Sequence, residues 1–365
     1  MPHDVFDFNS TVERCKSCFM CRYICTSART LTTEKDTPRG RSLLLSMIRR
    51  NTLEYSPDVA AAIYSCCLCA HCRASCMSSF DFPAAAVAAR EAIAETGLMP
   101  QAIQAARDSL LAHDNPYGIA SLDASLHAAL AELPKTADIL LLLGPDARYR
   151  CSSSALAAMA VFRKLDLPFT CLVQEPSSTY LLHEIGASKE SALKKDALAA
   201  AIAASGARRV VCLDPRAYHR MGSEAGSADK LHFLEVVAEH AGRLRPILGA
   251  APFSYHEPDY LVRWSDMGGQ TASVLQALGE AYTPPYWRGA ATQSLGSVLV
   301  SLYRPDFTER LVRARMEDFA ELGVTKVLVA TGDDWAILSE PAAAKGIVCE
   351  HIAETVAAAL DSSSK

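Results

Sequence analysis

The spacing of apolar positions is helical in the first part of the chain. Residues 1–115 include one apolar stripe after a predicted turn at 37–41, formed by Leu43, Leu44, Met47 and Ile48. Ser56 stands directly before a proline and predicts a helix N-terminus. Asp81 predicts the start of a further helix over 84–96. The pattern therefore predicts an all-helical N-terminal region.

After residue 135 short apolar runs alternate with helical segments. The predicted strands are 137–143, 169–173 and 209–213. Predicted helices at 153–164 and 194–203 separate them. Strands that alternate with helices are typical of a parallel α/β sheet.

The α/β part contains an internal repeat. Segment 206–214 resembles segment 323–331: each begins with glycine, continues as an apolar strand and ends in a polar turn. We interpret residues 136–245 and 246–360 as two copies of one unit, packed about a pseudo-twofold axis. The predicted fold class is α + α/β, with an N-terminal all-helical module over 1–115 followed by two repeated Rossmann-like α/β units.

Eight of the thirteen cysteines form a doubled pattern. The run Cys15-x2-Cys18-x2-Cys21-x3-Cys25 has the same spacing as Cys66-x2-Cys69-x2-Cys72-x3-Cys76. This spacing is typical of [4Fe–4S] ligands, and in two-cluster ferredoxins the last cysteine of each run ligates the other cluster. We therefore expect two [4Fe–4S] clusters: cluster 1 on Cys15, Cys18, Cys21 and Cys76, and cluster 2 on Cys66, Cys69, Cys72 and Cys25. Residues 1–115 are then expected to form an all-helical two-cluster ferredoxin module.

Two other uses of cysteine fit the pattern less well. Zinc takes four ligands, usually as two separated pairs, so a third cysteine after two more residues is surplus. Disulfides need an oxidising compartment, and the acidic N-terminal segment has no apolar core of a secretory signal. Cys67 breaks the doubled pattern, and we expect it to be a buried small residue and not a ligand.

Composition and charge argue against a nucleic-acid partner and against a membrane-spanning segment. The net charge is −5, and no basic tail or lysine run points to nucleic acid. Apolar runs such as 139–143 and 197–204 are far too short to span a bilayer. We expect a protein of two or three domains that is cytoplasmic or peripheral at the inner face of the membrane.

The chain resembles the iron–sulphur subunits of glycolate oxidase, lactate-utilisation systems, anaerobic glycerol-3-phosphate dehydrogenase and heterodisulphide reductase. The resemblance covers essentially the whole chain and rests on the two cysteine runs, on Pro-Arg-Gly-Arg at 38–41, and on the doubled α/β region. It implies cysteine-rich motifs in each α/β unit, of the types Gly-Cys, Cys-Cys-Gly and Cys-Pro-x-Cys. In heterodisulphide reductases these motifs hold catalytic iron–sulphur clusters.

This sequence departs from those motifs at every position that aligns. The replaced segments are 144–145, 175–179, 214–217, 256–259 and 331–334. Hydroxyl groups, proline and alanine cannot replace thiolates as iron–sulphur ligands. We therefore expect no cluster and no catalytic residue in the α/β half, whose cysteine-rich domains are degenerate.

Other polar residues near these positions are weaker candidates. One group consists of Asp214, His219, His256 and Asp259. It forms either a replacement metal site or, as we favour, a polar cleft with local hydrogen bonds. His71 either bonds to a cluster sulphur or is merely exposed. Three basic residues lie beside the cysteines: Lys16, Arg22 and Arg73. They either offset the negative charge of the thiolate-bound clusters or form a docking surface for an acidic partner.

The resulting functional hypothesis is a non-catalytic electron-transfer subunit of a flavin-dependent oxidoreductase complex. The resemblance implies a FAD- or FMN-containing dehydrogenase subunit as one partner. The second acceptor would be another flavoprotein, a quinone-linked component or a ferredoxin. Two alternatives stay open: a catalytic subunit of the heterodisulphide reductase type, and a structural or regulatory iron–sulphur protein.

Overall fold

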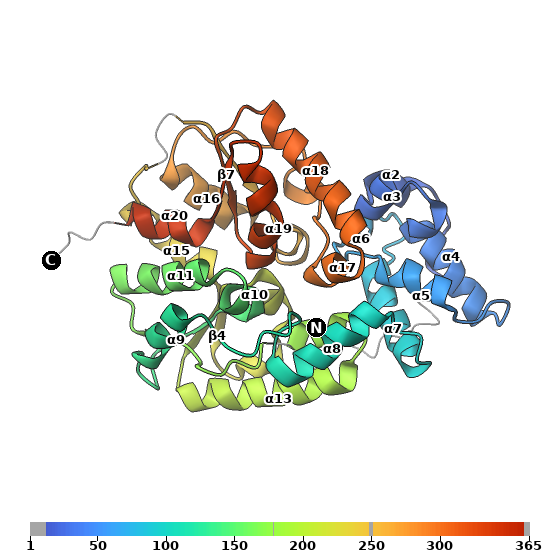
Figure 1. Cartoon of the computed structure of the whole chain (residues 1–365), viewed down its shortest axis with the longest axis horizontal. Helices are drawn as coiled ribbons and strands as arrows, with labels where there is room; N and C mark the ends of the chain where they lie inside the picture. Colours follow the sequence, from blue (N-terminus) through green and yellow to red (C-terminus); the bar gives the residue numbers. More distant parts are fainter. Residues whose placement is uncertain (1–11, 178, 248–250, 361–365) are drawn as a thin grey trace.

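The computed structural model describes residues 12–177, 179–247 and 251–360. The acidic N-terminal segment and Ser178 of the replaced 175–179 motif lie outside the described residues. Figure 1 shows a helical region, in blue to cyan, beside two α/β regions, one green to yellow and one orange to red. The predicted fold class, helices followed by parallel α/β sheets, is confirmed.

The region before the first strand is helical. Its elements are α2 Met20–Ile24, α3 Thr26–Leu31, η1 Glu34–Asp36, α4 Pro38–Arg49, α5 Pro57–Tyr64, α6 His71–Ala74, α7 Phe82–Glu95, α8 Gln101–His113 and α9 Ala124–Ala131. Ser56 caps α5 and Asp81 caps α7, as predicted. The predicted turn at 37–41 is wrong, because Thr37 accepts a hydrogen bond from the Gly40 N–H and α4 already begins at Pro38.

The first sheet is parallel with the strand order β2-β1-β3-β4. Its elements are β1 Ile139–Leu142, α10 Gly144–Tyr149, α11 Ser152–Lys164, β2 Phe169–Thr170, α12 Thr179–Glu184, α13 Ser188–Ser205, β3 Arg209–Cys212, α14 Pro215–Arg220, η2 Ser223–Ala225, β4 Asp229–His232, α15 Phe233–Glu239 and η3 Ala241–Arg243. Two predicted bounds are wrong. Strand β2 has only two residues, and α13 is longer than the predicted 194–203.

The second sheet is parallel with the order β5-β6-β7. Its elements are β5 Phe253–His256, η4 Tyr260–Trp264, α16 Gly268–Leu278, η5 Gly289–Ala291, α17 Val298–Tyr303, α18 Pro305–Glu321, β6 Lys326–Val329, α19 Gly332–Ala343, β7 Val348–His351 and α20 Ile352–Ala359. Strands β3 and β6 lie in the two segments of the predicted repeat, and each is followed by a parallel edge strand. The residue bounds of the three domains stay a prediction.

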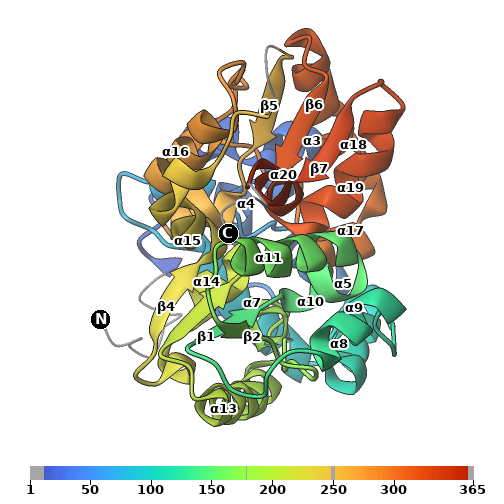
Figure 2. The same ribbon diagram turned by 90° about the vertical axis from the view of Figure 1, so that its left-hand side faces the viewer.

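Two apolar cores hold these parts together. Helices α11 and α20 lie between the two sheets (Figure 2), and one core joins Phe162 of α11 to Val356 of α20. The other joins the helical region to both α/β units through Ile63, Leu181 and Leu299. None of the helices in the described part of the chain is long and apolar enough to cross a membrane.

Candidate iron–sulphur site

The eight cysteines of the doubled pattern border two cavities in the helical region. The first cysteine cavity is bordered by Cys15, Cys18, Cys21 and Cys76. The second cysteine cavity is bordered by Cys25, Cys66, Cys69 and Cys72. Cys72 also touches the first cavity and Cys67 the second. The chain thus brings the last cysteine of each run to the first three of the other, the crossed grouping that two-cluster ferredoxins use.

The backbone of both cysteine runs turns in a way that suits a cluster. Ser17 and Leu68 occupy the same position, directly before the second cysteine of each run, and both have left-handed φ angles of 52° and 53°. Non-glycine residues adopt this region rarely, and such turns gather backbone N–H groups into the concave sites found around iron–sulphur clusters. The Leu68 N–H donates to Cys66 Sγ at 3.4 Å, and the Phe80 N–H donates to Cys76 Sγ at the same distance.

Without a cluster, burial keeps several of these thiols neutral. It raises the pKa of Cys69 to about 12, although the charge of Arg263 opposes the shift. Burial also raises the pKa of Cys21 to about 11 and that of Cys72 well above its usual range. Cluster ligands are thiolates, so binding releases these protons. The residues present fit two [4Fe–4S] clusters, and the assignment of the eight ligands stays a prediction.

The Pro-Arg-Gly-Arg segment at 38–41 makes hydrogen bonds to the first cysteine run, here called the first cysteine loop, and to the helix that precedes the second run, the second cysteine loop. Arg39 Nε donates to the Ser17 carbonyl at 2.7 Å in the first loop. Arg41 is fully buried, and its Nε donates to the Ala62 carbonyl at 2.7 Å, in the helix before Cys66. A Cβ on Gly40 would lie 2.0 Å from the Glu34 carbonyl oxygen, so only glycine fits there.

The second α/β unit covers the second cysteine cavity. Arg263 at the end of η4 donates to the Cys69 carbonyl through Nε and to the Thr292 carbonyl through NH1 at 2.7 Å. Trp264 Nε1 donates to the Leu68 carbonyl at 3.2 Å. Sequence reasoning missed both residues, because nothing in the spacing of η4 marks contacts to a loop almost two hundred residues earlier. At the first cavity Cys18 is exposed, and no residue of the described α/β units borders that cavity.

The charged candidates beside the cysteines have partners in the protein. Arg22 lies 3.7 Å from Glu34, and Arg73 lies 3.3 Å from Asp81 with its guanidinium over the Trp264 ring. Lys16 borders the first cavity.

His71 and Cys67 are both buried. Exposure of His71, one of the two alternatives considered for it, is therefore wrong. Its pKa is lowered to about 4 by burial and by the charges of Arg263 and Arg29. Cys67 packs against apolar side chains that include Val300 and Phe307, as expected for a small buried residue.

The four candidates near the replaced motifs do not share one site. Asp214 accepts from Tyr180, His219 packs against Trp264, His256 accepts from Arg315, and Asp259 lies near Arg263. Within the described ranges, no group of three or more His, Cys, Asp or Glu side chains is placed to hold a metal ion. The local hydrogen bonds that we favoured for this cleft are present.

Buried polar side chains lie at the contact between the two units and beside it in the first unit, and sequence reasoning missed most of them. Arg216 donates to Asp333 across the cleft at 2.5 Å. Tyr117 donates to Asp146, and Tyr180 donates to Asp214 at 2.8 Å. These six residues are called the interunit network below. Burial, together with the charges of Asp333 and Asp214, raises the pKa of Asp146 to about 8.

Two glycines allow close packing here, Gly332 between the two units and Gly144 within the first unit. A Cβ on Gly332 would lie 2.8 Å from the Cβ of Asp146, and one on Gly144 would lie 2.9 Å from the Cβ of Asp214. Gly144 also has a φ of 77°, which L side chains rarely adopt. The replaced Gly-Pro and Thr-Gly-Asp-Asp segments are therefore built for close packing.

Comparison with known proteins gives one distant similarity of note. No family model matches the chain. The chain is 27% identical over 329 residues to a Chromohalobacter salexigens protein named as a probable membrane-anchored ferredoxin. The alignment covers 83% of this chain and 49% of that protein, so the chain spans about half the length of the curated relative it matches.

Proposed function

We propose that this protein is an electron-transfer subunit that carries two [4Fe–4S] clusters and relays electrons between a flavoprotein and a second acceptor. The observation that carries the proposal is the crossed grouping of the eight cysteines around two cavities. The similarity to a protein named as a ferredoxin supports an iron–sulphur, electron-transfer role. Each cluster, when bound, would supply one-electron chemistry.

The two cavities differ in exposure, and this suggests where a partner docks. Four large apolar side chains close in sequence to the cysteines of the first cavity are exposed, and we call them the apolar rim: Phe19, Met20, Tyr23 and Met77. Met20 and Met77 border the cavity itself. Met77 is 84% exposed and follows Cys76 directly. Apolar and aromatic groups at a surface are typical of protein contact sites. We propose that the apolar rim binds the flavin-containing subunit, which would bring the flavin to the first cavity.

The second cavity lies under η4, and its electrons would leave through the α/β half. In this proposal the α/β units have no catalytic step of their own and act as a scaffold. The second acceptor is a flavoprotein, a quinone-linked component or a ferredoxin. The proposed location is cytoplasmic or peripheral at the inner face of the membrane.

Iron content tests the cluster part of the proposal. The anaerobically purified chain should contain about eight iron and eight sulphide per chain, because each of two clusters holds four of each. Chemical reduction should give a paramagnetic signal that disappears on reoxidation. A preparation with zinc in place of iron, or with no reversible reduction, would overturn the relay.

Affinity purification tests the docking part. A tagged chain expressed in its native cells should retain a flavoprotein, detected by its flavin absorbance. The double variant Tyr23→Ser/Met77→Ser should retain several-fold less of it at unchanged iron content. Leu193→Ser is the matched control, since Leu193 is 70% exposed on α13, and it should retain the partner fully. Equal retention by both variants would refute docking at the apolar rim.

A further inference from the structure

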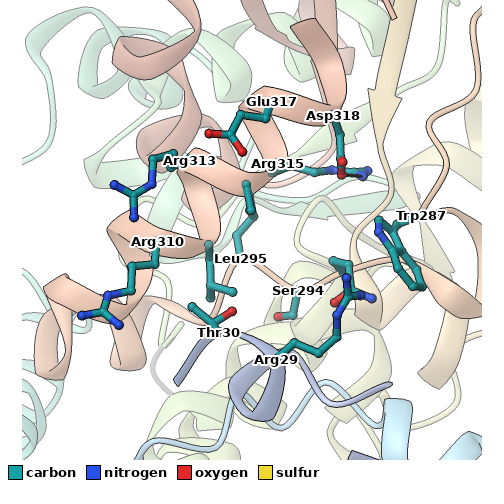
Figure 3. A pocket seen from close by; sticks show the side chains of 13 residues that line it. Arg29, Thr30, Trp287, Ser294, Leu295, Arg310, Arg313, Arg315, Glu317 and Asp318 are labelled. Carbon is teal, nitrogen blue, oxygen red and sulfur yellow. Dashed lines mark hydrogen bonds and ion pairs between the residues drawn. The ribbon is translucent and has the colours of Figure 1, made fainter. Parts of the chain in front are cut away.

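A pocket of about 510 Å³ opens between the helical region and the second α/β unit (Figure 3). Arg29 and Thr30 of α3 form one side, and α18 forms the other with its arginines. Between them, the segment that carries Trp287 and Leu295 completes the lining. A volume of this size suits a small organic ligand, since such sites usually occupy about 300–1,000 Å³.

The lining of this pocket is positive, although the chain as a whole is negative. Four arginines face two acids: Arg29, Arg310, Arg313 and Arg315 against Glu317 and Asp318. The lining therefore has a net charge of +2, whereas the whole chain has −5. Guanidinium groups bind phosphate through paired hydrogen bonds, so this composition favours an anion.

Arg315 adds a second observation, because one of its buried donor groups has no hydrogen-bond partner among the described residues. It is 2% exposed and donates to His256 Nδ1 at 3.1 Å and to Asp318 at 3.3 Å. Its NH2 group has no hydrogen-bond partner in the part of the chain that the structure describes. Buried cationic donors are normally paired, and leaving one unpaired is destabilising. Figure 3 shows Arg315 and Asp318 at the end of the pocket near Trp287.

The same end of the pocket offers a flat surface. The Arg29 guanidinium lies 4.2 Å from the centre of the Trp287 ring, and Figure 3 shows Arg29 reaching from α3 toward this ring. Leu295 and Leu311 add apolar surface to the lining. Planar rings stack on tryptophan and on arginine, and such stacking favours the binding of a heterocyclic base.

We propose that this pocket binds a small molecule that carries both a phosphate and a planar ring, the chemistry that flavin and adenine nucleotides share. The arginines would hold the phosphate, and the Trp287–Arg29 pair would hold the ring. The pocket begins one helical turn after Cys25, because the Arg29 N–H donates to the Cys25 carbonyl at 3.0 Å. The binding proposal does not depend on the clusters or on a redox partner.

Calorimetric titration of the full chain under anaerobic conditions tests the proposal with four probes: FMN, riboflavin, AMP and inorganic phosphate. We expect FMN or AMP to bind at least tenfold more tightly than phosphate, and FMN more tightly than riboflavin. Tighter binding of FMN identifies a flavin nucleotide, and tighter binding of AMP identifies an adenine nucleotide. If neither nucleotide binds, or if phosphate binds as tightly as both, the proposal is wrong.

Variants then locate the binding. Arg29→Ala/Arg310→Ala, one change on each side of the pocket, should weaken nucleotide binding by tenfold or more. Trp287→Leu should weaken nucleotide binding and leave phosphate binding unchanged. Arg50→Ala/Lys189→Ala removes the same charge from exposed positions elsewhere and should bind as the unchanged chain does. Iron content and thermal unfolding of each variant report its folding. Equal binding by the first double variant and this control would overturn the assignment to this pocket.

Discussion

The cysteine cavities and the cleft between the two α/β units satisfy their polar groups in opposite ways. Around the cavities, thiols from distant parts of the chain face a common space. In the cleft, Asp214 accepts from Tyr180, Asp333 accepts from Arg216, and Asp146 accepts from Tyr117. The first region therefore presents thiols to a shared space, whereas the second pairs most of its polar groups within the protein. Asp146 Oδ2 and Arg216 Nε are the buried atoms of the network without a hydrogen-bond partner in the described part of the chain.

The comparison shows how charged side chains can join the two units directly. In the family that the sequence resembles, cysteines are expected at the positions of 214–217 and 331–334. Here those positions supply Arg216 and Asp333, which form an ion pair across the cleft at 2.5 Å. Close packing around Gly332 leaves no room for a side chain there. At these positions an ion pair and close packing join the two units directly.

Removal of single cysteines should give the largest effects and test the contrast directly. Cys66→Ala and Cys18→Ala should each lower the iron content by about half, because each change removes a ligand from one of two four-iron clusters. Cys66→Ala should also lower stability more, since Cys66 lies in an apolar core and Cys18 is exposed. Iron analysis and urea unfolding measure the two effects.

Cys67→Ala is the matched control. Cys67 adjoins Cys66 and is buried to a similar extent, so this variant should keep about eight iron atoms. The crossed grouping adds a sharper test: Cys25→Ala should lose the same paramagnetic signal as Cys66→Ala. Loss of the signal that Cys18→Ala removes would instead show that each run holds its own cluster.

Local sequence rules predicted much of the fold. Ser56 and Asp81 cap helices because their side chains accept from backbone N–H groups a few residues later, which is a local interaction. The apolar runs at β1 and β3 predicted buried parallel strands, because this signal also lies in neighbouring residues of the chain. The rules failed at 37–41, where proline and glycine suggested a turn. There Gly40 is required by the nearby Glu34 carbonyl, within a helix.

The cysteine spacing predicted a grouping that the cavities match, because ligand spacing is a local property of the chain. The contacts of Arg263 and Trp264 with the second cysteine loop were not predictable in this way. They depend on how the second unit packs against residues 66–72, and no periodic pattern records that packing. The interunit network was not predicted for a similar reason. Asp146 nevertheless directly follows Gly144-Pro145, one of the replaced segments.

Arg263 links the two regions, and its removal should have an intermediate effect. Arg263→Met keeps the apolar stem and leaves the carbonyls of Cys69 and Thr292 without their donors. We expect a loss of about 2 kcal/mol in stability. Release of iron to a chelator should also become faster, with about half of the iron affected. Arg50→Met, at an exposed position, should change neither quantity. Unchanged iron release in Arg263→Met would show that the second unit does not protect the second cavity.

Titration of Asp146 should give the smallest effect and tests the cleft side of the comparison. Its pKa is raised to about 8 by burial and by the charges of Asp333 and Asp214, while an unfolded aspartate has a pKa of about 3.9. Between these values the folded chain binds a proton that the unfolded chain has lost. The resulting stability is therefore fully present below about pH 4 and is lost as the pH rises toward about 8.

Asp146→Asn has no proton to lose, so the slope of stability against pH should be smaller between pH 5 and pH 8. Because the charge is shared with neighbouring carboxylates, we expect the change across this window to be about 1 kcal/mol, below the limit of about 1.4 kcal/mol per pH unit for one proton. Urea unfolding at several pH values measures it, at constant iron content. Asp138→Asn, at an ion pair with the exposed Arg208, should leave the slope unchanged. If both variants keep the original slope, the interunit network does not hold a proton, and its carboxylates are neutralised by Arg216 alone.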